Sequence, residues 1–157
     1  MEKSVSLFDQ IREQFGVEKV EAKQYSPLTL AYIGDGIYEI VIRTILVGKA
    51  NAPVNILNRK ASSIVKAEAQ ANLIHAIEEE LTEAEMAVYK RGRNAKSYTS
   101  AKNASIRDYR TATGFEALMG YLYMDNQMER ALELVQLGLE RTQGWNSTTG
   151  SFEEKLR

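Results

Sequence analysis

The segment over residues 28–47 is apolar on almost every side when it is placed on a helix, and this feature constrains the fold more than any other. Its apolar residues are Leu30, Ile33, Ile37, Tyr38, Ile40, Val41, Ile42, Ile45 and Leu46. A helix that is hydrophobic all round is usually buried among other elements. Ser26-Pro27 before it is typical of an N-cap followed by the first helical position, and Gly48 after it is typical of a helix end. We therefore expect a central helix here.

The rest of the chain also has the pattern of helices. The 157 residues contain only two prolines, apolar residues recur every three to four positions, and no stretch alternates as a strand does. Thr82 and Glu85 have the spacing of a capping box. The further helices that we expect cover residues 5–15, 53–81, 82–89, 112–124 and 127–142. These features predict an all-α helical bundle with one domain over residues 1–143, followed by a linker-like, flexible tail over residues 144–157.

The composition excludes several kinds of chemistry. There is no cysteine, which rules out thiolate nucleophiles, iron–sulfur clusters and Cys-ligated zinc. His75 is the single histidine, so a two-histidine metal site is ruled out as well. The formal net charge is −1, so any affinity for nucleic acid must come from a local patch. The first residues lack the apolar core of a signal peptide and no apolar run is long enough to span a bilayer, so we expect a cytoplasmic protein without membrane contact.

The polar residues of the central segment form one narrow line. Asp35, Glu39 and Arg43 follow one another at intervals of four residues and share a helix face. Gly34 and Gly36 flank the aspartate, although each costs a helix about 1 kcal/mol relative to alanine, which indicates a close approach of another backbone. The line can be a solvated stripe with an ordinary ion pair. Alternatively, Asp35 lies at the floor of a site, where burial requires a compensating cation.

Glu116 lies in a similar setting. It stands between Gly114 and Gly120 in the apolar segment over residues 112–124. Thr113 and Glu116 also have capping-box spacing, so the glutamate can instead satisfy a backbone N–H. Two carboxylates in apolar, glycine-flanked settings, in a chain without cysteine, favour a site for a hard cation such as Mg²⁺ or Mn²⁺.

Residues 90–110 carry a strong local positive charge. Seven basic residues against one acid leave an excess of +6 in a chain whose total is −1. The basic residues are Lys90, Arg91, Arg93, Lys96, Lys102, Arg107 and Arg110. A phosphate-binding surface requires such segregation, because neutralised phosphates release counterions. A solvated loop can have the same composition, so the charge alone leaves both interpretations open.

Three segments of the chain resemble the ribonuclease III family. Leu30-Ala31-Tyr32-Ile33-Gly34-Asp35-Gly36-Ile37 is similar to a reduced form of the family's signature. Thr113-Gly114-Phe115-Glu116-Ala117-Leu118-Met119-Gly120 resembles its second acidic motif, and Arg59-Lys60-Ala61-Ser62-Ser63-Ile64-Val65-Lys66 is similar to its middle helix. The resemblance covers residues 25–142 and leaves no room for a double-stranded-RNA-binding domain. This combination resembles the Mini-ribonuclease III branch, which consists of the catalytic domain alone.

The resemblance implies a fold, an activity and site residues. The fold would be the ribonuclease III endonuclease domain working as a homodimer on double-stranded RNA, with Mg²⁺ as cofactor and Mn²⁺ as a substitute. Asp35 and Glu116 match the family's catalytic, metal-binding acids, and Glu68 matches an auxiliary metal-binding acid of the middle helix. Three further acidic positions of the family hold Leu28, Ala31 and Thr113 in this chain. A site with fewer carboxylates leaves more of the coordination to water or RNA phosphate.

The same resemblance implies partners and an RNA-binding surface. The substrate would be precursor 23S ribosomal RNA near its paired ends, and a ribosomal protein is a further possible partner. The residues that we expect to bind RNA are Arg91, Arg93, Asn94, Lys96, Ser97 and Lys102. Two other functions stay open. The first is a non-catalytic duplex-RNA-binding or ribosome-assembly factor that retains the fold, and the second is an all-α, Mg²⁺-dependent nucleotide pyrophosphatase.

Overall fold

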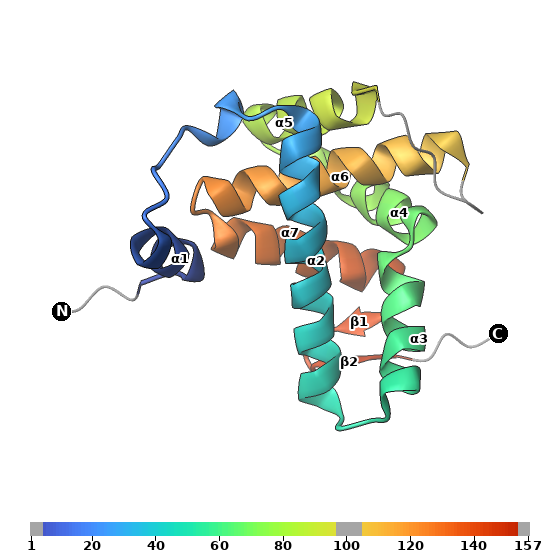
Figure 1. The fold of residues 1–157 in the computed structure, drawn as a ribbon. Helices are drawn as coiled ribbons and strands as arrows, with labels where there is room; N and C mark the ends of the chain where they lie inside the picture. Colours follow the sequence, from blue (N-terminus) through green and yellow to red (C-terminus); the bar gives the residue numbers. More distant parts are fainter. Residues whose placement is uncertain (1–4, 97–104, 154–157) are drawn as a thin grey trace.

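The computed structural model describes residues 5–96 and 105–153, and these residues form an almost entirely helical structure (Figure 1). The α-helices are α1 (Leu7–Phe15), α2 (Pro27–Lys49), α3 (Val54–Val65), α4 (Ala67–Ile77), α5 (Glu83–Asn94), α6 (Ile106–Met124) and α7 (Met128–Thr142). Two 3-10 turns, η1 (Ala22–Gln24) and η2 (Glu78–Glu80), and the short strands β1 (Trp145–Asn146) and β2 (Ser151–Phe152) complete the described fold. The all-α prediction is confirmed.

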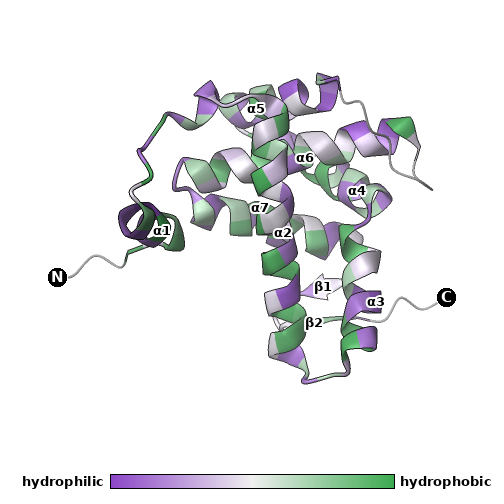
Figure 2. Ribbon diagram, in the orientation of Figure 1, coloured by the Kyte–Doolittle hydropathy of each residue, from purple (hydrophilic) through white to green (hydrophobic). Residues whose placement is uncertain are grey.

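Helix α2 is the central helix that its composition predicts. The Ser26 hydroxyl caps it by accepting a hydrogen bond from the Thr29 N–H at 3.2 Å, and Pro27 is its first residue. Its largest interface is with α6, and it also contacts α3 and α5. Figure 1 shows α2 crossing α6, and Figure 2 shows hydrophobic residues along the whole length of α2. The fully buried large side chains of the common core include Tyr38, Ile42, Leu73, Ile74, Phe115, Leu118, Leu122 and Leu134.

Two glycines bring the backbones of α2 and α6 into direct contact. A Cβ atom added to Gly34 would lie 1.7 Å from the carbonyl oxygen of Glu116, and one added to Gly120 would lie 1.9 Å from that of Leu30. The expected close approach is therefore confirmed at Gly34. It is wrong for Gly36, where an added Cβ would meet nothing within 4 Å among the described residues. Hence no side chain separates the two helices where they cross.

The predicted helix over residues 53–81 is divided into α3, α4 and η2. Lys66 has the extended angles φ −63° and ψ 156° between α3 and α4, so the chain turns a corner there. Two buried side chains hold this corner: the Tyr38 hydroxyl donates to the Ile64 carbonyl at 3.3 Å, and the Gln70 amide donates to the Val65 carbonyl at 2.7 Å. Apolar periodicity continues through the corner, and Lys66 has good helix propensity. The sequence pattern alone therefore misses the break.

The basic connection predicted over residues 90–103 is wrong in its first part. Helix α5 continues to Asn94, because lysine and arginine are good helix formers and their charge is favourable near a helix C-terminus. The capping box of Thr82 and Glu85 at the start of α5 is confirmed. Helix α6 begins at Ile106, earlier than the predicted residue 112, behind the capping side chain of Ser105. Residues 97–104 lie outside the described part.

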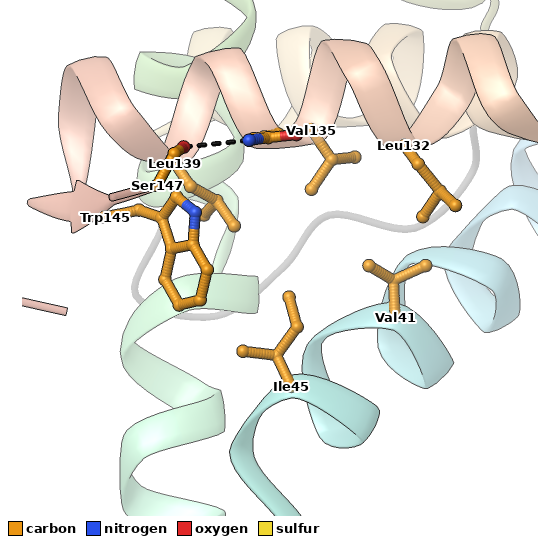
Figure 3. A pocket seen from close by; sticks show the side chains of 8 residues that line it. Val41, Ile45, Leu132, Val135, Leu139, Trp145 and Ser147 are labelled. Atoms are coloured by element: carbon orange, nitrogen blue, oxygen red, sulfur yellow. Dashed lines mark hydrogen bonds between the residues drawn. The ribbon is translucent and has the colours of Figure 1, made fainter. Parts of the chain in front are cut away.

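Residues 145–152 form a packed hairpin where the composition predicts a flexible tail. β1 and β2 are antiparallel with Trp145 opposite Phe152, and the ring centroids of these residues are 5.0 Å apart. Gly150 supplies the positive φ of 65° that the connecting turn requires. Figure 3 shows Trp145 beside α7, lining a pocket of about 250 Å³ that Val41 and Ile45 of α2 close on the other side. Burial of these two aromatic rings against the helices stabilises the hairpin. Residues 154–157 lie outside the described part.

Candidate active site

The crossing of α2 and α6 brings Asp35 and Glu116 together, although 81 positions separate them in the chain. Asp35 is exposed and Glu116 is half-buried. Burial, a side-chain hydrogen bond with Asp35 and the negative charge of Asp35 raise the pKa of Glu116 to about 9. The sequence interpretation placed the buried carboxylate at position 35, and the structure places it at position 116. Two carboxyl groups thus share one small site.

The position of both acids follows from the glycine contact. Gly34 lies directly against the backbone of Glu116, so the residue after Gly34 and the side chain of Glu116 meet at the same crossing. The capping role that Thr113 spacing suggested for Glu116 is wrong. Thr113 lies inside α6, where its hydroxyl donates to the Tyr109 carbonyl at 2.9 Å, and the cap of this helix is Ser105. The Glu116 side chain is therefore available to the site.

A third polar group reaches the pair from α4. The Gln70 side chain is 4% exposed and hydrogen-bonds the carboxylate of Glu116, which lowers the pKa of Glu116 against the larger effects of burial and Asp35. Sequence analysis missed this residue. The available signal was a long polar side chain on the buried face of α4, between Ala69 and Ala71.

Glu68 does not join the pair into a larger acidic cluster. It is exposed in the first turn of α4, two residues before Gln70. Over residues 5–96 and 105–153, no group of three or more His, Cys, Asp or Glu side chains is arranged to hold a metal ion. The three positions where the family pattern has further acids are also without carboxylates, because they hold Leu28, Ala31 and Thr113. Any ion at this site therefore relies on two carboxylates.

The two carboxylates fit a hard divalent cation. Two like charges held together are unfavourable unless a proton or a cation compensates them, and the half-burial of Glu116 adds to this cost. The raised pKa of Glu116 reflects this cost, because burial and the negative charge of Asp35 both favour the protonated carboxyl. Oxygen ligands supplemented by water are the coordination that Mg²⁺ prefers in proteins. The site therefore has the donor atoms of a carboxylate-held metal centre.

The rest of the polar line on α2 forms an ion pair. Arg43 Nε lies 3.1 Å from Glu39 Oε2, and both side chains are accessible to solvent. The sequence interpretation of an ordinary ion pair is correct for these two residues. Asp35, the first residue of the line, lies beside Glu116 instead, and it is exposed rather than buried as the alternative interpretation expected. Glu39 adds negative charge near Glu116, although it contributes less to the raised pKa than Asp35 does.

The described basic residues of the segment over residues 90–110 lie at the end of α5 and at the start of α6. Arg91, Asn94 and Lys96 are exposed, and the Arg93 guanidinium lies 5.5 Å from the centre of the Tyr89 ring. A hollow of about 560 Å³ lies between the two helices and α4. Its lining residues are His75, Arg93, Asn94, Ile106, Arg107, Arg110 and Thr111. Ser97 and Lys102, also expected to bind RNA, lie outside the described residues.

The fold is that of a ribonuclease III domain. The family model described as Ribonuclease III domain matches residues 28–127, a range that contains both acids and Gln70. A crystal structure of a Fusobacterium nucleatum protein superposes with a TM-score of 0.68 at 26% identity, covering 74% of this chain and 93% of that one.

More similar relatives define the branch of this family. The chain is 54% identical over 120 residues to the Mini-ribonuclease 3 of Clostridium tetani, covering 76% of this chain and 80% of the relative. It is 55% identical over 115 residues to the Mini-ribonuclease 3 of Enterococcus faecalis, covering 72% and 87%. The chain belongs to the Mini-ribonuclease 3 family, a group of ribonuclease III-type endoribonucleases. In the described part, no helix combines the length and the apolar content of a membrane span.

Proposed function

We propose that this chain is a Mg²⁺-dependent endoribonuclease that hydrolyses phosphodiester bonds in double-stranded RNA, with Asp35 and Glu116 as its metal-holding catalytic residues. The observation that carries the proposal is the meeting of these two carboxylates at the glycine contact between α2 and α6. Membership in the Mini-ribonuclease 3 family supports the reaction class. The precursor 23S ribosomal RNA substrate, a ribosomal-protein partner and the cytoplasmic location rest on sequence and family resemblance, and they stay predictions.

The residues present supply the positioning that such a reaction needs. When bound, Mg²⁺ polarises a phosphate oxygen and lowers the pKa of a water molecule that attacks the phosphorus. Asp35 and Glu116 hold their oxygens in place through main-chain contact of two helices, so little reorganisation accompanies binding. Glu116 binds a cation only after it has lost its proton. The remaining coordination falls to water and to the RNA phosphate.

The basic surface at the end of α5 and the start of α6 supports recognition of an RNA duplex. Its basic residues can contact phosphates, and an A-form duplex is recognised by shape, phosphates and 2′-hydroxyls rather than by base edges. Arg91, Arg93, Asn94 and Lys96 of this surface are the described residues that we propose as contacts. Arg107 and Arg110 line the same hollow as Arg93 and extend the expected set.

We propose a homodimer that forms through one face of α2. This face carries Leu28, Tyr32, Ile40 and Val47, which are 39%, 83%, 54% and 60% exposed, and the Glu39–Arg43 ion pair lies among them. Several exposed large apolar side chains on one side of a helix, mixed with a few charged groups, are typical of a protein interface. A second copy of the chain presents the same residues, so a two-fold axis through this face would bury the apolar side chains of both copies together. Two active sites, one per subunit, would then act on the two strands of a duplex.

Loss of either acid tests the catalytic assignment. We expect Asp35→Asn and Glu116→Gln each to lower the rate of cleavage of a plain RNA duplex in Mg²⁺ by at least about a hundredfold, because metal and attacking water lose their support. Circular dichroism should show unchanged helical content. Glu129→Gln, an exposed carboxylate of α7, is the matched control and should keep full activity.

The outcome also separates the alternative functions. Wild-type cleavage by either acid variant would contradict the assignment. If the wild-type chain binds duplex RNA in Mg²⁺ without cutting it, the chain is instead the non-catalytic RNA-binding factor. Hydrolysis of nucleoside triphosphates with no action on duplexes would indicate a pyrophosphatase.

A further inference from the structure

The Gln70 amide is buried beside the acidic pair and makes two hydrogen bonds of different kinds. Its side chain is 4% exposed, and its Nε2 donates to the Val65 carbonyl at 2.7 Å. The same side chain hydrogen-bonds the Glu116 carboxylate. A primary amide nitrogen carries two N–H groups, so it can serve both acceptors at once.

The orientation of this amide is fixed by its partner. A backbone carbonyl accepts hydrogen bonds and cannot donate them, so the atom facing Val65 must be the nitrogen. The other end of the amide, Oε1, is buried and has no hydrogen-bond partner among the described residues. A buried acceptor without a donor costs about 1–3 kcal/mol. The unsatisfied acceptor belongs to the same side chain that interacts with Glu116.

We propose that Gln70 is a positioning residue of the nuclease centre, which holds the Glu116 carboxylate beside Asp35 and offers Oε1 as an acceptor to a polar ligand of the site. This inference rests on the proposed function. Hydrogen-bond partners behind metal-ligating carboxylates fix the direction of the ligand oxygens, and their loss typically costs about 10–100-fold in metal affinity or activity. Gln70 also donates a hydrogen bond to the carbonyl of Val65, the last residue of α3, so it connects the site to the corner between α3 and α4.

Gln70 could instead act only by stabilising the corner between α3 and α4, and a variant of Tyr38 is the matched control for that alternative. The Tyr38 hydroxyl makes a similar buried bond to the neighbouring carbonyl of Ile64 at 3.3 Å. Tyr38→Phe therefore loosens the same corner and leaves the hydrogen bond to Glu116 in place. Gln70→Met keeps the length and the approximate volume of the side chain and removes its hydrogen-bonding groups.

The experiment measures Mn²⁺ binding to the RNA-free protein by electron paramagnetic resonance, together with kcat and KM on a duplex RNA. For Gln70→Met we expect about tenfold weaker Mn²⁺ binding and a comparable fall in kcat, with KM unchanged. Tyr38→Phe should lower the thermal midpoint and leave both Mn²⁺ affinity and kcat at wild-type values. If Gln70→Met does not fold, Gln70→Asn replaces it, since the shorter amide cannot span both acceptors and should show the same loss.

Two results would overturn the role of Gln70. One is wild-type Mn²⁺ affinity in the folded Gln70 variant, and the other is an equal loss in Tyr38→Phe, which would make the effect one of the corner alone. The Glu116→Gln variant shows whether only the role of Gln70 is wrong or the proposed metal site is wrong as well. If Glu116→Gln binds Mn²⁺ normally, the metal site itself is refuted. If Glu116→Gln loses binding while Gln70→Met keeps it, only the role of Gln70 is refuted.

Discussion

At the scale of single residues, Gly34 determines the geometry of the site. Its missing side chain lets the backbone of α2 touch that of Glu116, and this contact sets where both carboxylates lie. The sequence predicted that the two acids lie together and that the backbones approach closely at Gly34. It did not indicate Gln70, because a buried amide within a helical pattern looks the same as a surface residue until the packing partner is known.

We expect Gly34→Ala to destabilise the fold by about 3 kcal/mol or more, because its Cβ would overlap the Glu116 carbonyl and force the helices apart. Gly48→Ala in the same helix is the control. Its Cβ would meet nothing within 4 Å among the described residues, so stability should hold or rise by up to about 1 kcal/mol. Urea unfolding of both variants measures the difference. Equal stability of the two would show that α2 and α6 do not touch at Gly34.

At the scale of elements, an ion pair joins the start of α5 to α7. Arg130 Nε donates to Glu85 Oε2 at 2.9 Å, and Arg130 Nη2 donates to Oε1 at 3.0 Å. Burial alone would raise the pKa of Glu85, but its hydrogen bonds with Arg130 and with the Thr82 N–H outweigh burial and hold that pKa below the usual value. Sequence spacing predicted the cap at Thr82. It could not predict Arg130, which is 45 positions away.

This pair should make the stability depend on pH in the acidic range. A carboxyl with a lowered pKa stabilises the fold above its unfolded pKa, and this contribution is lost as the pH falls through the folded pKa. We expect the free energy of unfolding of the wild type to fall from about pH 5 to about pH 3 more steeply than that of Glu85→Gln. At pH 7 Glu85→Gln should be about 2 kcal/mol less stable.

Glu133→Gln is the matched control for this pH dependence. Glu133 also binds Arg130, at 2.7 Å, but its side chain is 69% exposed. An exposed pair contributes at most about 1 kcal/mol, so this variant should keep the wild-type pH profile. Parallel profiles for wild type and Glu85→Gln would exclude Glu85 as the source of the acid sensitivity.

At the scale of the whole molecule, the sequence predicted the class of fold and the meeting of the acids, and it misplaced the ends of elements. Helices that bury an apolar face have a periodic signal, whereas the corner at Lys66 depends on side chains from α2 and α4. The hairpin was missed for the same reason, since Trp145 and Phe152 are held by helices distant in sequence. The acidic pair was predictable because a glycine or a carboxylate within an apolar helix destabilises that helix. Such residues therefore stand out in the sequence as candidates for a site.

The proposed dimer is tested by charging the exposed face of α2. Tyr32→Arg should shift sedimentation from dimer to monomer and leave helical content intact, because an 83% exposed side chain contributes little to the folded chain. Phe15→Arg, which charges an aromatic residue of α1 that is 75% exposed, is the control and should remain dimeric. A dimeric Tyr32→Arg variant would exclude this face.

The basic surface should determine how duplex binding depends on salt. In a Glu116→Gln background, which prevents cleavage, replacing Arg91, Arg93 and Lys96 with alanine should weaken binding and reduce the slope of log K against log salt by up to about 3. The control replaces Lys19 and Lys23, which are exposed basic residues before α2. An unchanged slope in the first variant, or an equal change in the control, would show that this surface does not contact the duplex.

The bare main-chain contact between α2 and α6 has a practical consequence for protein engineering. Because the two main chains meet directly at Gly34 and Gly120, exposed substitutions away from this crossing and from Gln70 leave the contact that spaces the two carboxylates unchanged. Surface residues away from this crossing can therefore be redesigned, for instance to change which RNA sequences are cut, while the arrangement of the two carboxylates is kept. Conversely, a variant library that includes the crossing glycines will consist mostly of inactive clones.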